Sequence, residues 1–177
     1  MTKVLGLDLD GVLYRWHEAV YEYFRMYKNY TDSFSHLWEY DYKDLSKEDW
    51  EFLINIDFLY SCEVPTPDCI SFLNNVKYRF DIYYVTGRPL SVKTTTEQFL
   101  KRYKFPFREN LIFASDKQNT IRRLKINYFI DDLPYNLEEL SKVTNVIMLA
   151  RPYNREFRET YNTAYSLMDS LKFLNSE

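Results

Sequence analysis

Short apolar runs along the chain alternate with longer segments in which apolar residues recur every three or four positions. A short apolar run is typical of a buried strand, and the longer spacing is typical of a helix with one buried face. The expected strands are Lys3–Leu7, Asp81–Val85, Leu111–Ala114, Tyr128–Ile130 and Asn145–Leu149. The expected helices between them are Asp68–Tyr78, Ser91–Tyr103, Thr120–Leu124 and Tyr135–Ser141. This alternation predicts an α/β fold, a Rossmann-like parallel sheet of about five strands with helices on both faces.

One stretch after the first strand interrupts the alternation. It contains a helical pattern over Trp16–Tyr27 and a second one that begins near Ser46, where Ser46 and Asp49 resemble an N-cap arrangement. Pro65 and Pro67 mark the return of the chain to the sheet. We therefore expect a small helical insertion. The expected division is a core domain of residues 1–13 and 66–177 and a helical cap subdomain of residues 14–65.

The composition is that of an ordinary globular protein, with 177 residues, 46% of them hydrophobic and 28% charged. Its formal net charge of -3 disfavours an extended nucleic-acid surface and suits a small anionic substrate. Cys62 and Cys69 show no zinc-like spacing, which favours a reduced compartment. Because the chain enters its first strand at once and has no apolar run that could span a bilayer, we expect a cytoplasmic protein without a membrane partner. Monomer and homodimer are both open.

Polar residues follow four of the expected strands directly. In parallel sheets of this kind, ligands bind outside the carboxyl ends of the strands, so these residues should meet at one edge. They are Asp8 and Asp10 with Gly11 after the first strand, Thr86-Gly87-Arg88 after the second, Ser115-Asp116-Lys117 after the third and Asp131-Asp132 after the fourth. Acids, a hydroxyl, a glycine and a lysine would then converge on one site.

This set of residues suits phosphoryl transfer. Asp8 would be the nucleophile and a metal ligand, and its attack would give an aspartyl-phosphate. Asp10 would protonate the leaving oxygen and then activate water. The remaining residues would bind the phosphate or Mg²⁺: Thr86, Gly87 and Arg88 the phosphate, Lys117 both the nucleophile and the phosphate, and Asp8, Asp10, Asp131 and Asp132 the Mg²⁺ ion.

Each assignment has a simpler alternative. Two acids after a strand can be a solvated strand end, and Asp131-Asp132 can begin a turn before Pro134. Lys125 competes with Lys117, which we favour because it starts a helix just after a strand. Asp131 is the first choice for direct metal contact, and Asp132 would act through water. Arg88 is either a phosphate contact or a surface charge. Core packing competes with base stacking for Trp16, Trp38 and Tyr40, and His17 and His36 are expected to be structural or exposed.

The motifs Asp8-Leu9-Asp10-Gly11-Val12, Thr86-Gly87-Arg88, Lys117 and Asp131-Asp132 resemble, in order and placement, the four motifs of the haloacid dehalogenase (HAD) superfamily. The resemblance covers residues 1–13 and about 66–150, and Asp10 is similar to the acid found in the phosphatase branches. The insertion after the first motif resembles that superfamily's C1 cap, which closes over the site and selects substrates.

Within the superfamily the chain most resembles the 5′(3′)-deoxyribonucleotidases of bacteria and phages. This rests on size, the compact helical cap, the Asp8–Leu13 opening and the Arg151–Arg155 run. The resemblance implies that an apolar residue shortly after the first motif contacts the base, and Trp16 is the nearest candidate. Gly87-Arg88 departs from the pair found in mammalian members, so phosphate or sugar contacts could differ.

The sequence therefore predicts an Mg²⁺-dependent phosphomonoesterase that hydrolyses nucleoside 5′-monophosphates, with a deoxynucleotide as the leading substrate. One alternative enzyme acts on another small phosphate ester or on a polynucleotide end. A different class is a non-catalytic module that binds a phosphate ligand. This class is disfavoured, because every residue needed for turnover is present.

Overall fold

The computed structural model describes residues 2–27, 47–48, 51, 59–60 and 64–174. These residues contain one parallel sheet with the strand order β3-β2-β1-β4-β5-β6. Its strands are β1 (Lys3–Leu7), β2 (Phe80–Thr86), β3 (Leu111–Phe113), β4 (Tyr128–Asp131), β5 (Asn145–Leu149) and β6 (Asn162–Ala164). The α/β parallel-sheet prediction is confirmed, with the bounds of β1 and β5 as expected.

The sequence prediction of about five strands missed β6, which lies at the edge of a six-stranded sheet. Among the strands described here it pairs only with β5, where Ile147 faces Asn162 and Leu149 faces Ala164. A strand of three residues that includes Asn and Thr shows no apolar alternation. Its pairing with β5, and not its own residue pattern, makes it a strand.

The helices expected between the strands and the one expected over Trp16–Tyr27 are present, some with shifted ends. They are α1 (Trp16–Tyr27), α5 (Cys69–Val76), α6 (Lys93–Arg102), α7 (Lys117–Leu124) and α8 (Pro134–Leu140), and a short α9 (Leu171–Leu174) follows β6. Single turns of 3-10 helix precede α6 and β3, and a longer one, η3 (Pro152–Phe157), follows β5. Helix α7 begins three residues before the predicted Thr120, because the Asp116 side chain caps it by accepting the backbone N–H of Asn119 at 2.9 Å.

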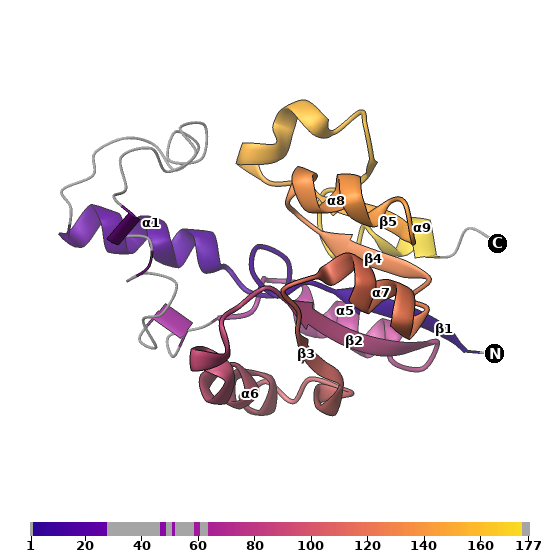
Figure 1. Ribbon diagram of the computed structural model, residues 1–177, viewed down its shortest axis with the longest axis horizontal. Coiled ribbons are helices and arrows are strands. Elements are labelled where there is room, and N and C mark those ends of the chain that lie inside the picture. The colour runs from indigo at the N-terminus through magenta and orange to yellow at the C-terminus, as the bar shows by residue number, and fades with distance from the viewer. Residues whose placement is uncertain (1, 28–46, 49–50, 52–58, 61–63, 175–177) are drawn as a thin grey trace.

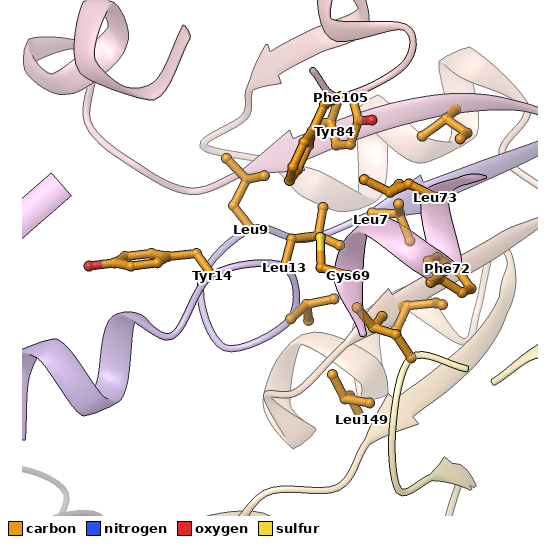
Figure 2. Packing of buried hydrophobic residues seen from close by; sticks show 14 of the residues in the cluster. Leu7, Leu9, Leu13, Tyr14, Cys69, Phe72, Leu73, Tyr84, Phe105 and Leu149 are labelled. Carbon is orange, nitrogen blue, oxygen red and sulfur yellow. The ribbon is translucent and has the colours of Figure 1, made fainter. Parts of the chain in front are cut away.

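Side chains from alternate residues of the central strands enter two different cores. In β4, Tyr128 and Ile130 belong to the larger core, and Phe129 belongs to the smaller one. Helices α1, α5, α6 and α9 pack into the larger core, whereas α7 and α8 pack into the smaller. The sheet is therefore covered on both faces, as predicted. Figure 2 shows part of the larger core, including Cys69 of α5, whose thiol is free and fully buried.

The loop after β1 connects the sheet to helix α1. Backbone N–H groups of Val12, Leu13 and Tyr14 all donate to the carbonyl of Leu9, which gives a tight loop. Tyr14 forms an isolated bridge with Pro65, so the two ends of the expected insertion meet. Figure 1 shows α1 beyond the carboxyl end of β1, on the side of the sheet opposite the two chain termini.

The extent of the insertion, residues 14–65, stays a prediction. Most of it lies outside the described residues, and so do Ser46, Asp49, Trp38, Tyr40 and His36. None of the helices formed by the part of the chain described here is long and apolar enough to cross a membrane.

Candidate active site

The predicted site residues meet at the carboxyl edge of the sheet, because β1 lies between β2 and β4. A cavity of about 830 Å³ opens there. Its polar lining includes Asp8, Asp10, Gly87, Arg88 and Lys117. Asp8 and Lys117, which are 109 positions apart, therefore share one cavity, as the parallel-sheet rule predicted.

Three buried carboxylates form the centre of the site. Asp8, Asp131 and Asp132 each offer an oxygen atom, and these atoms lie within 4.8 Å of one another. Nζ of Lys117 lies 2.9 Å from Oδ1 of Asp8 and 3.0 Å from Oδ2 of Asp131. We call Asp8, Asp131, Asp132 and Lys117 the aspartate cluster. Lys125, the competing lysine, instead follows the last residue of α7 in a left-handed conformation.

The two acids from the end of β4 differ in how their oxygens are used. Oδ1 of Asp131 accepts the backbone N–H of Leu133, and Oδ2 accepts Lys117 and the side-chain amide of Asn136, each at 3.0 Å. Asp132 is fully buried and its Oδ2 contacts His17 and Tyr153, while its Oδ1 has no hydrogen-bond partner among the described residues. The oxygen left for a cation is therefore on Asp132.

Burial and mutual repulsion shift the ionisation of this cluster. Burial raises the pKa of Asp8, against the opposing effect of Lys117. Burial, with the nearby Asp131 charge, raises the pKa of Asp132 to about 7. Burial alone would lower the pKa of Lys117, but Asp131 and Asp8 together outweigh it and raise that pKa. The carboxylates are therefore short of positive charge.

The aspartate cluster fits a divalent metal ion. When all three carboxylates are ionised, one ammonium leaves two negative charges, and a divalent cation carries the opposite charge. The donors are oxygen atoms only, which hard cations prefer. The buried Oδ1 of Asp132 further supports this fit, because a buried acceptor without a partner is costly.

Asp10 lies apart from this cluster and pairs with Arg88. Nη2 of Arg88 lies 2.6 Å from Oδ1 of Asp10, and Nε lies 2.9 Å from Oδ2. Nη1 of Arg88 donates to Oγ1 of Thr96 at 2.9 Å, and the guanidinium lies over the ring of Tyr60. We call Asp10 and Arg88 the arginine pair. Arg88 is 5% exposed, so the surface-charge alternative for it is wrong.

Thr86 and Gly87 lie at the end of β2, beside the arginine pair. The Thr86 hydroxyl is buried and accepts the backbone N–H of Arg88 at 3.2 Å, which leaves its own proton available to a ligand. A Cβ on Gly87 would meet no atom within 4 Å, and Gly87 lines the cavity. The packing of the protein therefore does not require glycine at this position. The missing side chain would instead allow a ligand in the cavity to approach the backbone closely.

Aromatic residues form much of the remaining lining. They are Trp16, Tyr60, Tyr135, Tyr153 and Phe157. Trp16 is 6% exposed and also belongs to the larger core, so packing and cavity lining are both present at this position.

Sequence reasoning missed several residues that surround the acids. His17 is buried at the site, and burial lowers its pKa to about 3. The others are Tyr153, which donates to Asp132, Asn136, which donates to Asp131, and Asn154, whose amide donates to the carbonyls of Asp132 and Leu149. The Arg151–Arg155 run carried a signal for Tyr153 and Asn154, because it was a point of resemblance. His17 and Asn136 carried none.

The fold and the site together define a HAD-type phosphatase, and a comparison with a solved structure supports the fold. A haloacid dehalogenase-like hydrolase from Streptococcus pneumoniae superposes with a TM-score of 0.69 at 12% identity, covering 98% of this chain and 99% of that one. The sequence matches the family described as "5' nucleotidase, deoxy (Pyrimidine), cytosolic type C protein" over residues 2–172. The chain belongs to this nucleotidase family.

Two bacterial proteins that match this chain are named as proposed nucleotidases. The one from Bacillus cereus is 33% identical over 112 residues, which are 60% of this chain and 59% of that protein. The one from Oceanobacillus iheyensis is 25% identical over 165 residues, which are 85% of this chain and 88% of that protein. The match to the Bacillus cereus protein thus spans less than two thirds of its length.

Proposed function

We propose that this chain hydrolyses nucleoside 5′-monophosphates, with a deoxyribonucleotide as the leading substrate, through an aspartyl-phosphate on Asp8. The observation that carries the proposal is the Asp8 carboxylate, which lines the cavity in contact with Lys117 and belongs to a group of three buried carboxylates. Membership of the nucleotidase family supports the substrate class. The description of that family as cytosolic also supports a cytoplasmic location.

In the first step an Asp8 oxygen would attack phosphorus, and the bond from phosphorus to the ester oxygen would break. Lys117 would hold Asp8 in place and offset negative charge on the phosphoryl oxygens. The Thr86 hydroxyl and the Gly87 backbone amide would donate to the phosphate. Protonated Asp10 would give its proton to the leaving oxygen, so that a neutral alcohol departs.

In the second step water would attack phosphorus and give its proton to the Asp10 carboxylate, and the bond from Asp8 to phosphorus would break. Arg88 holds that carboxylate from one side. Because Nε and Nη2 of Arg88 already contact both oxygens of Asp10, we propose that Arg88 acts mainly through Asp10.

Mg²⁺ is the metal ion we propose, and when bound it would screen the repulsion between Asp8 and the phosphate. Asp8 and Asp132 would hold it, with Asp131 beside them. The sequence favoured Asp131 for direct contact. The hydrogen bonds support Asp132 instead, because three protein donors already occupy Asp131.

The cavity supports a nucleotide over a smaller ester. Its volume of about 830 Å³ exceeds what a phosphate alone requires, and its aromatic lining could stack on a base. We propose Trp16 as one such contact, and the insertion 14–65 as the cap that selects the substrate.

A panel of substrates tests the proposal. Phosphate release is measured with Mg²⁺ for deoxyribonucleoside and ribonucleoside 5′-monophosphates, sugar phosphates, a 5′-phosphorylated oligonucleotide and an aryl phosphate. We expect the deoxyribonucleotides to have the highest kcat/KM. Faster turnover of a sugar phosphate or of the oligonucleotide would overturn the nucleotide assignment, and no turnover of any ester would favour a binding module.

A further inference from the structure

His17 and Tyr153 reach the same oxygen of Asp132 from two different elements. His17 lies in the first turn of α1, and its Nε2 is 3.2 Å from Oδ2 of Asp132. Tyr153 lies in η3, and its hydroxyl donates to the same Oδ2. When Asp132 is ionised, its carboxylate only accepts hydrogen bonds, so Nε2 of His17 then carries the proton in this contact.

The backbone around this contact leaves room for it. Gly11 has a φ of 77°, and a Cβ at this position would overlap the Asp132 carboxylate and lie 2.8 Å from Nε2 of His17. Glycine is thus required here both by the left-handed backbone and by the approach of His17 to Asp132.

Both partners of Asp132 are themselves held in place. The His17 ring packs edge-on against Trp16 at 5.5 Å and against Tyr153 at 4.9 Å between ring centroids. The fully buried Asn154, next to Tyr153, donates to the carbonyls of Asp132 and Leu149. The contact is therefore part of a packed unit that joins α1, β4 and η3.

We propose that His17 and Tyr153 are positioning residues, which fix Oδ2 of Asp132 so that Oδ1 is presented to a divalent cation. Two hydrogen bonds to one oxygen hold the carboxylate against rotation, and the other oxygen is buried and has no hydrogen-bond partner within the described part of the chain. Because His17 lies on α1, the first helix after the loop, cation binding and the placement of this helix are linked. This inference rests on the metal-binding part of the proposed function.

The test measures cation affinity of the full chain without any substrate. The metal-free protein is titrated with Mn²⁺, and free Mn²⁺ is followed by electron paramagnetic resonance. The variants are His17→Phe, which keeps a ring but loses the hydrogen bond, His17→Gln, which keeps a donor, and Tyr153→Phe. Tyr84→Phe is the matched control, because the Tyr84 hydroxyl donates to the Pro106 carbonyl, outside the cavity lining.

We expect His17→Phe and Tyr153→Phe each to weaken Mn²⁺ binding by about tenfold, the scale on which such supporting partners act. His17→Gln should bind more tightly than His17→Phe, and Tyr84→Phe should bind as the wild type does. Wild-type affinity in both His17→Phe and Tyr153→Phe would overturn the inference and leave these residues with a packing role. If His17→Phe does not fold, His17→Gln and Tyr153→Phe decide.

The outcome is separate from that of the substrate panel. Wild-type protein that binds Mn²⁺ with the expected order of variants, but hydrolyses no nucleotide, would overturn the proposed substrate and support the inference. Nucleotide hydrolysis with unchanged Mn²⁺ affinity in the variants would overturn the inference alone. No Mn²⁺ binding by the wild type would overturn the inference together with the metal-binding part of the function.

Discussion

The aspartate cluster and the arginine pair lie at the same edge of the sheet, but their charges are arranged in opposite ways. In the arginine pair, one guanidinium faces one carboxylate through several hydrogen bonds, and Thr96 and Tyr60 hold the guanidinium. In the aspartate cluster, three buried carboxylates share one ammonium, and burial raises the pKa of Asp132 to about 7. The pair is therefore balanced by the protein alone, whereas the cluster is balanced when a divalent cation joins it.

The largest expected effect comes from changing the reacting group of the cluster. Asp8→Asn should lower phosphate release by roughly 10⁴-fold or more, because a nucleophile cannot be replaced by its neighbours. The fold should persist, since the amide removes one of three crowded charges. Thermal unfolding in EDTA checks the fold, and phosphate release with the best substrate checks the rate. Activity close to that of the wild type would rule out the aspartyl-phosphate on Asp8.

Breaking the arginine pair should mainly cost stability. Arg88→Met leaves Asp10 beside apolar surface without its cation, and we expect a loss of about 3 kcal/mol in the free energy of unfolding. This expected loss lies near the lower end of the range for buried ion pairs, because the Asp10 side chain is 22% exposed. Urea unfolding measures the loss.

Lys93→Met is the matched control for Arg88→Met. Lys93 pairs with Glu97 at 3.7 Å on the surface of α6, where both side chains are more than half exposed. Its loss should cost no more than about 0.5 kcal/mol, as for other exposed pairs. Equal losses in the two variants would contradict the difference between a buried and a surface pair.

Without metal, Asp132→Asn should become more stable relative to the wild type as the pH rises. The pKa of Asp132 is raised in the folded protein, so between about pH 4 and pH 7 the folded state holds more protons than the unfolded state. The stability of the metal-free wild type relative to Asp132→Asn should therefore fall as the pH rises through this window. Thermal unfolding in EDTA at a series of pH values measures it, and a constant difference would contradict the shift.

Asp169→Asn provides a control of opposite sign. The backbone N–H of Tyr165 and the side chain of Lys172 lower the pKa of Asp169. The ionised Asp169 side chain stabilises the fold above its ordinary pKa, and this contribution is lost on acidification. The stability of the wild type relative to Asp169→Asn should therefore increase as the pH rises. The effect should be small, because the group is near the surface.

Added Mg²⁺ should reverse the stability order of wild type and Asp132→Asn. A cation at 100 times its dissociation constant adds about 2.7 kcal/mol to the folded state, and the variant should gain less. Thermal unfolding with increasing Mg²⁺ checks this expectation. Equal gains would place the cation away from Asp132.

The smallest effect is expected for Thr96→Val. This change removes the hydroxyl that accepts Nη1 of Arg88, and we expect a loss of about 1 kcal/mol in the free energy of unfolding. The Asp10 contacts of Arg88 remain, so kcat should change little. A large fall in kcat would mean that Thr96 has a further role at the site.

The local pattern of the sequence was sufficient to predict most of the fold. Apolar runs predicted β1 and β5 with their observed bounds, because these strands are buried on both faces. The edge strand β6 was not predicted, since only pairing with β5 defines it. The apolar pattern of Thr120–Leu124 missed the first three residues of α7, which are polar and are held by the Asp116 cap, although the position of Lys117 just after a strand did indicate a helix start there.

For the site, the sequence indicated which residues come together but not how they pair. The parallel sheet brings Asp8, Lys117 and Asp131 to one edge, and this could be predicted. The choice of Arg88 as the partner of Asp10, 78 residues away, could not. The contact of His17 with Asp132, 115 residues away, was likewise beyond any local pattern.

By itself, the sequence determined the α/β architecture, the edge of the sheet that carries the chemistry and the residue types found there. These follow from short-range periodicity and from the fixed direction of parallel strands. Only the tertiary structure decided which charges are paired, which oxygen of Asp132 lacks a partner and which aromatic residues line the cavity. Such outcomes depend on packing between elements far apart in the chain, where distances of one ångström decide whether two groups form a bond.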